Sequence, residues 1–284
     1  LVFVPGAYCY DAEKALYTFN CEYYYKGLIY GYDGDVENCS TYLDETIEIM
    51  WTGNYVCSRL SGSKLDEFIE LTNGRKPFIW MNYPVNDYSP SVIRIGPGEV
   101  YDEIYADSDE AKISGLVSNM MLEVEASKTS LFTASDYCWN TRDYDMNKSY
   151  VDAFKYVEPN TPESLLEICQ HLRNTHAQFD NAHFEEAPEL KQLINLFEEE
   201  YETGNYSNSI NKLNAYFEKL NYACDDFLIN GKNVKLIKEI SAWVKSIKYG
   251  ALAAINFLKV ISKQYSYDES MFYKKQASNL YELN

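Results

Sequence analysis

Short apolar runs and longer helical stripes divide the chain into two differently patterned parts. Up to about residue 157 each apolar run is brief and ends at turn-forming residues; these runs occupy residues 1–4, 46–51, 78–81 and 115–119. Runs of this length predict buried strands, and the spacing of Leu65, Phe68 and Leu71 predicts a helix over residues 63–71. Strands that alternate with helices are typical of βα units around a parallel sheet.

Beyond residue 157 the apolar positions recur at helical spacing. Thr161 followed by Pro162 is an N-cap with proline at the first helical position. Apolar stripes then cover residues 165–172, 190–197, 210–227 and 237–261, and the clearest stripe consists of Ile237, Ile240, Val244, Ile247, Ala251, Ala254, Leu258 and Ile261. Helices with one apolar face predict an antiparallel bundle. We therefore predict two domains, residues 1–157 with the sheet and residues 158–284 with the bundle.

Two segments of the first part carry weaker patterns. Residues 9–44 are rich in Tyr, Asp, Asn and Gly with little periodicity, and we predict a long loop with at most one helix there. We predict a short helix over residues 100–106. Residues 33–37 resemble a calcium loop, but Asn38 stands where an EF-hand needs glycine, which argues against calcium binding.

Composition and charge narrow the possible function classes. The chain has 284 residues, of which 46% are hydrophobic and 24% charged, an ordinary globular balance, and its net charge is −18. Such a chain repels phosphate backbones and anionic membrane surfaces, so we expect no nucleic-acid partner. No apolar run approaches the ~20 residues of a membrane span.

The sequence shows no metal or cofactor motif. Its seven cysteines are scattered without a C-x-x-C pair, which argues against a zinc site and a redox dithiol. His171, His176 and His183 are separated by five and seven residues, not by the four that place two ligands on one helix face. We expect surface or packing histidines, no metal and no cofactor.

Residues 78–88 concentrate the candidate site residues. A predicted buried strand over residues 78–81 runs directly into turn formers, so it delivers Trp80, Asn82 and Asp87 to one edge of the sheet. A parallel α/β barrel builds its site from polar groups at the C-terminal ends of its strands. From this segment alone, a core strand followed by a plain surface turn remains an alternative.

Six motifs follow one another along the first part of the chain, at the ends of strands as we interpret them. They are Val4-Pro-Gly-Ala-Tyr8, Ile49-Met-Trp-Thr-Gly53 with Val56, Ile79-Trp-Met-Asn-Tyr-Pro-Val-Asn-Asp-Tyr88, Ile95-Gly-Pro97, Ser118-Asn-Met120 and Thr133-Ala-Ser-Asp-Tyr-Cys-Trp-Asn140. In this order and at these intervals they resemble glycoside hydrolase family 84, which comprises bacterial β-N-acetylglucosaminidases, often labelled hyaluronidases, and animal O-GlcNAcases. Glu186-Ala-Pro-Glu-Leu190 and the helices after it resemble the bundle behind the bacterial catalytic barrel.

The resemblance implies roles for four polar residues. Tyr8 matches the tyrosine beside the acetamido group and the anomeric carbon, and it supports catalysis together with Asn82. Asn82 matches the asparagine that helps to order the acetamido group and the catalytic carboxylate. Asp87 and Asn119 match groups that hydrogen-bond sugar hydroxyls.

The resemblance also implies an apolar pocket for the N-acetyl methyl group. Thr52 and Val56 match positions that line this pocket, and Trp80 matches its aromatic wall. An apolar pocket with few polar groups suits a neutral sugar, because aromatic faces pack on its C–H surface. The alternatives are that Thr52 and Val56 are plain core, that Trp80 fills the barrel, and that Asp87 only forms a turn.

The resemblance implies an α/β fold, the C-terminal half of a TIM (β/α)8 barrel with its last four strands, followed by an all-α helical bundle. The family's paired aspartates lie on the strand before the one that here begins at Leu1, and neither is in this sequence. In the family the first aspartate orients the substrate acetamido group, and the second acts as general acid and then base. We expect the missing half of the barrel earlier in the same gene product or on a second chain.

The function implied by the resemblance is that of a retaining β-N-acetylglucosaminidase. It works by substrate-assisted catalysis through an oxazoline, on glycans or glycoproteins with β-linked N-acetylglucosamine. The alternative is a non-catalytic glycan-binding or structural protein on the same fold. The absent aspartates favour this alternative if the chain is the full product, whereas the retained site residues, Tyr8, Trp80, Asn82, Asp87 and Asn119, favour the enzyme. Resemblance to bacterial members favours a secreted or cell-surface location.

Overall fold

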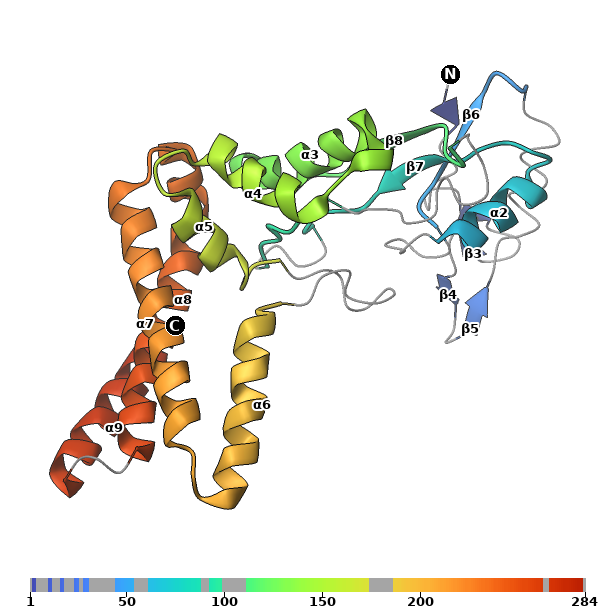
Figure 1. The fold of residues 1–284 in the computed structure, drawn as a ribbon. Helices are drawn as coiled ribbons and strands as arrows, with labels where there is room; N and C mark the ends of the chain where they lie inside the picture. Colours follow the sequence, from blue (N-terminus) through green and yellow to red (C-terminus); the bar gives the residue numbers. More distant parts are fainter. Residues whose placement is uncertain are drawn as a thin grey trace.

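The computed structural model shows a small parallel sheet with helices at its side and a long helical bundle (Figure 1). It describes residues 2–3, 10–11, 16–17, 23–25, 28–30, 44–53, 61–87, 92–98, 111–173, 186–262 and 266–282. The candidate residues Tyr8 and Val56 and the helix predicted over residues 100–106 lie outside these described residues. Within the described ranges, no helix is both long and apolar enough to cross a membrane.

Four short strands form the parallel sheet in the order in which the chain meets them. They are β1 (Val2–Phe3), β6 (Glu48–Trp51), β7 (Phe78–Met81) and β8 (Gly115–Ser118). Every neighbouring pair is parallel, so the C-terminal ends of the strands meet at one edge. Each of the segments in which we predicted a strand, residues 1–4, 46–51, 78–81 and 115–119, contains one of these four strands, so the predictions are confirmed for the described residues.

Helices α2 (Gly62–Leu71) and α3 (Val124–Trp139) cover one face of this sheet. Ile49, Trp51 and Ile79 project from that face into a core that also contains Leu65, Phe68 and Tyr137. The rings of Trp51 and Phe68 lie 4.7 Å apart, centroid to centroid. Because side chains alternate between the two faces of a strand, Trp80 projects from the opposite face.

Two segments that we interpreted as strand ends are not strands. Residues 133–139 lie in α3, so the interpretation of residues 133–140 as a strand end was wrong. The buried positions of α3 are mostly small, among them Ala126, Ser130 and Thr133, so its buried face shows no stripe of large apolar residues that would mark a helical period. Residues 95–97 also form no strand, and helices hold this loop instead. A 3₁₀ turn, η1 (Thr141–Asp143), and α4 (Met146–Val157) follow α3.

Residues 9–44 contain strands, where we predicted a loop with at most one helix. Strand β2 (Tyr10–Asp11) pairs antiparallel with β3 (Leu16–Tyr17), and β4 (Tyr23–Tyr25) pairs antiparallel with β5 (Leu28–Tyr30). Tyrosine favours strands, so its high frequency in this segment indicates strands even though the apolar positions show no regular period.

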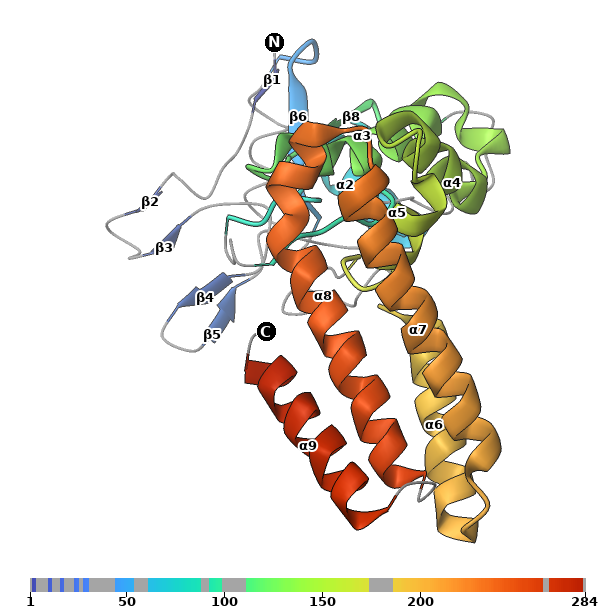
Figure 2. The ribbon, with the colours of Figure 1, turned by 90° about the vertical axis from the view of Figure 1, so that its left-hand side faces the viewer.

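The second part of the chain is helical, as predicted. It contains α5 (Pro162–Cys169), α6 (Pro188–Thr203), α7 (Ser207–Asn230), α8 (Val234–Ile261) and α9 (Tyr267–Glu282). Helices α6 to α9 run up and down beside one another, as both views show (Figures 1 and 2). Four members of the predicted stripe on α8 are buried, namely Ile240, Val244, Ala251 and Leu258. Helix α9 was not predicted, because it is largely polar.

The largest core cluster joins side chains from both sides of residue 157. Ile95 and Phe154 from the first part pack in it with Ile168, Phe227 and Ile240 from the second. The predicted boundary between residues 157 and 158 therefore crosses a shared apolar core, and the division into two domains stays a prediction.

Candidate functional site

The candidate site lies where β7 and β8 end at the C-terminal edge of the sheet. The register pairs Met81 with Ser118, so Asn82 and Asn119 follow at equivalent positions of two neighbouring strands. The Asn119 backbone N–H donates to the Met81 carbonyl at 2.9 Å, and the Val85 N–H donates to the Asn119 carbonyl at 3.0 Å. The backbone thus continues the pairing past the strand ends and holds the two asparagines side by side.

Three of the predicted site residues meet through one oxygen atom. Asn82 Oδ1 accepts hydrogen bonds from Trp80 Nε1 at 2.8 Å and from Asn119 Nδ2 at 3.0 Å. An amide oxygen has two lone pairs, so these donors use both and fix which end of the Asn82 amide accepts and which donates. We call these three half-buried residues the Asn82 cluster.

Thr52 lies at the end of β6, on the other side of β7 from β8, and is level with Trp80 in the register. The register pairs Trp51 with Ile79, which places Thr52 beside Trp80 at the end of β6. Trp80 pairs with Val117 of β8, whose side chain is exposed. By the alternation of side chains, Thr52, Trp80, Asn82 and Asn119 share the sheet face opposite to α2 and α3.

Asp87 is not part of the Asn82 cluster. It is exposed at the end of the turn that follows β7. Its neighbour Asn86 is buried and donates from Nδ2 to the Val92 carbonyl and to Glu123 Oε2, both at 3.0 Å. The turn that carries Asp87 is therefore anchored, and the Asp87 carboxylate itself faces solvent.

Tyr83 and Gly96 anchor the same region, and sequence reasoning gave neither a role. The Gly96 N–H donates to the buried Tyr83 hydroxyl at 2.8 Å, and Ser130 Oγ donates to the Gly96 carbonyl at 2.7 Å. A Cβ at position 96 would lie 2.2 Å from Tyr83 Oη, so only glycine fits. Buried Tyr150 donates its hydroxyl to the Ile95 carbonyl at 2.5 Å, and burial raises the pKa of Tyr150. The signal available in the sequence was the pair of glycines around Pro97.

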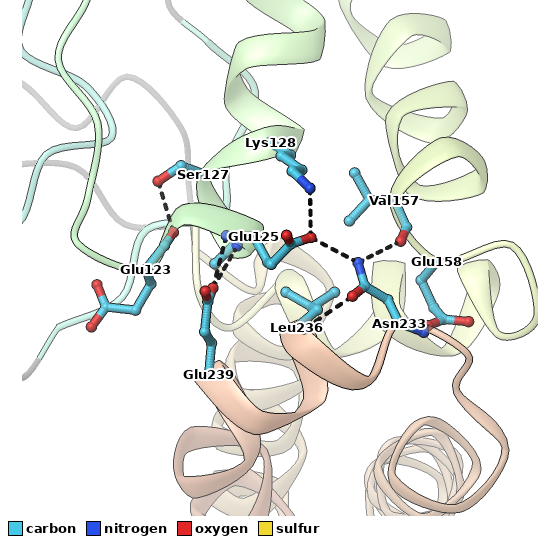
Figure 3. Close-up of polar contacts among 10 residues, drawn as sticks. Glu123, Glu125, Ser127, Lys128, Val157, Glu158, Asn233, Leu236 and Glu239 are labelled. Atoms are coloured by element: carbon cyan, nitrogen blue, oxygen red, sulfur yellow. Dashed lines mark hydrogen bonds and ion pairs between the residues drawn. The ribbon is translucent and has the colours of Figure 1, made fainter.

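A junction rich in carboxylates ties the start of α3 to the start of α8 (Figure 3). The Glu239 carboxylate of α8 accepts the backbone N–H groups of Glu125 at 2.9 Å and Ala126 at 3.1 Å. Asn233 Nδ2 donates to Glu125 Oε2 at 3.1 Å and to the Val157 carbonyl at 3.0 Å. A negative side chain is favourable at a helix N-terminus, where backbone N–H groups lack partners. The bundle thereby holds the segment that leads from Asn119 into α3.

Two further carboxylate interactions stabilise this junction. Glu158 is fully buried, and its carboxylate accepts the backbone N–H groups of Lys232 and Asn233 at 2.7–2.9 Å. Glu125 accepts a hydrogen bond from the Lys128 ammonium at 2.7 Å, and this bond, followed by the one from Asn233, lowers the pKa of Glu125. Glu125 and Glu158 therefore both have the donors that a buried carboxylate requires.

The Asn82 cluster consists of two amides and an indole, and none of these groups exchanges a proton near neutral pH. It suits binding and orienting a neutral polar ligand. In the described part of the chain, no group of three or more His, Cys, Asp or Glu side chains is placed to hold a metal. His171 is half-buried and hydrogen-bonded to the Tyr216 hydroxyl at 2.9 Å, so of the two roles predicted for the histidines, surface or packing, it has the second.

Comparison with known proteins gives one family and several similar structures. A family model described as beta-N-acetylglucosaminidase matches residues 8–170. The structure of CpGH84D is 28% identical with a TM-score of 0.79, and the match covers 99% of this chain and 44% of that one. The structure of CpGH84B is 22% identical with a TM-score of 0.80, and the match covers 99% of this chain and 47% of that one.

A mutant O-GlcNAc hydrolase from Thermobaculum terrenum is also similar in structure. It is 20% identical with a TM-score of 0.74, and the match covers 98% of this chain and 54% of that one. At this identity, as for CpGH84B, the likeness concerns the fold alone. The chain spans about half the length of the three solved structures that it matches.

Proposed function

The chain belongs to the beta-N-acetylglucosaminidase family, glycoside hydrolase family 84, and from this premise we propose that it is part of an enzyme that hydrolyses β-linked N-acetylglucosamine from glycans or glycoproteins. The observation that carries the proposal is the Asn82 cluster. It brings together Trp80, Asn82 and Asn119, three residues that the family resemblance assigns to one sugar, at the C-terminal edge of a parallel sheet.

The roles proposed for these residues follow from their chemistry. The two hydrogen bonds to Asn82 Oδ1 make Nδ2 the donating end of its amide, and we assign this amide to ordering the acetamido group and the catalytic carboxylate. Trp80 forms the aromatic wall of the pocket for the acetyl methyl group. Asn119 and Asp87 bind sugar hydroxyls, and the exposure of Asp87 suits a group that meets substrate from solvent.

Three further residues complete the proposed substrate contacts. Thr52 lies beside Trp80 in the register, which supports its assignment to the acetyl pocket. Tyr8 and Val56, outside the described residues, take their proposed positions from the resemblance alone, beside the anomeric carbon and in the acetyl pocket.

The proposed mechanism is the substrate-assisted form of retaining hydrolysis. The acetamido carbonyl oxygen attacks the anomeric carbon, the glycosidic C–O bond breaks, and a carboxylic acid protonates the leaving oxygen. A second carboxylate accepts the amide proton, so that a neutral oxazoline forms. Water, deprotonated by the first group, then attacks the anomeric carbon, breaks its bond to the oxazoline oxygen and restores the acetamido group. Among the described strands, none ends in an adjacent pair of carboxylates. The proposal places the aspartate pair, with the other half of a (β/α)8 barrel, on protein before Leu1 or on a second chain.

The test is steady-state hydrolysis of an aryl N-acetyl-β-glucosaminide by the protein that carries these residues. Asp87→Ala removes a carboxylate whose charge-assisted hydrogen bonds are worth roughly 1.5–3 kcal/mol each, so we expect kcat/KM to fall on the order of 10²-fold. Asp268→Ala, which removes an exposed carboxylate on α9, is the matched control and should leave kcat/KM unchanged. Near wild-type kcat/KM in a folded Asp87→Ala protein would place the sugar site elsewhere.

A second candidate function is glycan binding without catalysis. The observation that favours it is the composition of the Asn82 cluster, which offers binding groups and no acid or base. Saturable binding of N-acetylglucosamine with no turnover of the aryl glycoside would support this function instead.

A further inference from the structure

A cleft lies at the end of the bundle that is remote from the sheet. It is lined by Phe197 and Tyr201 of α6, Tyr206 of the α6–α7 turn, and Val260 and Ile261 at the end of α8, and its volume is about 340 Å³. Both ribbon views place the α6–α7 turn and the end of α8 at this extremity (Figures 1 and 2). We call it the bundle-end cleft. Its volume is at the lower end of the range for small-molecule sites.

The three aromatic rings form one continuous wall of the cleft. Ring centroids are 5.3 Å apart for Tyr201 and Tyr206, 5.6 Å for Phe197 and Tyr201, and 6.0 Å for Phe197 and Tyr206. Tyr201 is 58% exposed, so its ring is open to solvent. Tyrosine hydroxyls usually find a partner when they are covered. In the described part of the chain, neither the Tyr201 hydroxyl nor the Tyr206 hydroxyl forms a hydrogen bond with a protein group.

The turn that carries Tyr206 is held in one conformation. Gly204 ends α6 with a φ of 76°, a left-handed conformation that favours glycine. The Glu200 carboxylate then bridges the turn, since it accepts from Asn208 Nδ2 and from the Ser209 backbone N–H, both at 2.9 Å. These hydrogen bonds lower the pKa of Glu200, so the bridge persists at neutral pH. A preorganised wall reduces the ordering cost of binding.

The charges around the cleft select among possible ligands. The described residues that line the cleft carry no charged side chain, while Glu198, Glu199 and Glu202 follow Phe197 and Tyr201 along α6. These carboxylates disfavour an acidic ligand. The net charge of −18 disfavours a second copy of this chain. A long apolar helix would need a longer groove than the described lining residues form.

We infer that the bundle-end cleft binds a neutral pyranose sugar. The C–H face of a pyranose packs on aromatic rings, and its hydroxyls can exchange hydrogen bonds with the Tyr201 and Tyr206 hydroxyls. The ligand class is therefore a neutral mono- or disaccharide, bound at the end of the bundle that is remote from the sheet. This inference does not depend on the proposed hydrolase activity.

The test uses sugars that lack an acetamido group, so that the acetyl pocket of the candidate site contributes little. Methyl β-D-glucopyranoside and cellobiose are titrated into the whole chain and followed by saturation-transfer NMR and calorimetry. For so small a contact we expect a dissociation constant on the order of 1 mM. Tyr201→Ala should weaken cellobiose binding about tenfold, and Tyr201→Phe, which keeps the ring, about two- to threefold.

Tyr222→Ala is the matched control. Tyr222 is a tyrosine of α7 that is 68% exposed and lies outside the cleft lining, so cellobiose binding should not change. Because Tyr201 is exposed, its replacement should leave the thermal unfolding temperature close to that of the wild type, which each variant's melting curve verifies. Absence of saturable sugar binding, or equal affinities of Tyr201→Ala and wild type, would overturn the inference. So would loss of cellobiose binding in Asn82→Ala with full binding in Tyr201→Ala.

Discussion

The bundle and the parallel sheet bury their apolar residues in different ways. Helices α7 and α8 are consecutive in the chain and close their apolar stripes on each other and on α5, with Phe227, Ile240 and Val244 in the largest core cluster. The sheet buries Ile49, Trp51 and Ile79 on one face only, while Trp80 of the opposite face remains half-buried.

This difference assigns stability and ligand binding to different surfaces. In the bundle the apolar faces of the helices pack against one another, and the cleft proposed to bind a sugar lies at its far end. In the sheet the two faces of the same strand have separate tasks, because alternate residues point to opposite sides. A substitution on the covered face should change stability, and one on the other face should change activity.

The largest expected effect comes from removing an aromatic ring from each region. Phe227→Ala should lower the free energy of unfolding by about 3–5 kcal/mol, since it leaves a cavity in a large rigid core. Phe68→Ala, in the smaller core under the sheet, should cost about 3 kcal/mol or less because its neighbours relax into the space. Urea unfolding of both variants measures the two costs. A larger loss for Phe68→Ala would reverse the ranking of the two regions.

Asn82→Ala should separate activity from stability. Trp80 Nε1 and Asn119 Nδ2 lose their acceptor, so we expect kcat/KM to fall on the order of 10²-fold. The free energy of unfolding should change by less than about 1 kcal/mol, because half-buried donors can turn to water. The measurements are kinetics on an aryl N-acetyl-β-glucosaminide and urea unfolding. Asn195→Ala on the exposed side of α6 is the control, and a stability loss without an activity loss would contradict the division of faces.

Gly96→Ala should destabilise the loop beside the sheet by about 1–3 kcal/mol. The added Cβ would lie 2.2 Å from Tyr83 Oη, and the ring of Tyr83 is buried and cannot move aside. The double variant Gly96→Ala with Tyr83→Phe removes the clashing oxygen, so it should recover part of the loss. Thermal unfolding of the two single variants and the double variant tests this coupling. If the stability losses of the two single variants simply added up in the double variant, the Cβ at position 96 and the Tyr83 hydroxyl would not be in contact.

The smallest expected effect is a pH dependence at the start of the bundle. Burial lowers the pKa of His171, and Glu167 opposes this effect only in part. The folded protein therefore favours neutral His171, and its contribution to stability is complete above the unfolded pKa of about 6.5 and is lost as the pH falls below that value. The unfolding temperature of His171→Gln should therefore fall less between pH 7 and pH 5 than that of the wild type. The difference should correspond to the contribution of a single titrating group. An unchanged dependence of the unfolding temperature on pH would show that groups other than His171 control this dependence.

Some of the candidate site could be predicted from the sequence because it depends on local pattern. The run over residues 78–81, followed at once by asparagine and proline, identified both β7 and the position of Asn82. The contact between Asn82 and Asn119 could be expected only in outline, since it requires β7 and β8 to be neighbours. The anchoring of Asp87 through Asn86 and Glu123 had no sequence signal, because the two anchoring residues are 37 positions apart.

The sequence by itself determined the elements whose apolar spacing is regular, which are the four parallel strands, α2 and the helices from α5 to α8. It also carried the family resemblance, because the motif residues keep their order along the chain. The tertiary structure alone decided that residues 133–139 are helical, since a helix that buries mostly small side chains shows no clear apolar stripe in the sequence. It also decided that Glu239 and Asn233 hold the start of α3, since these contacts cross more than 100 residues. Hydrogen bonds of that range depend on how the elements pack, and packing leaves no periodic trace in the sequence.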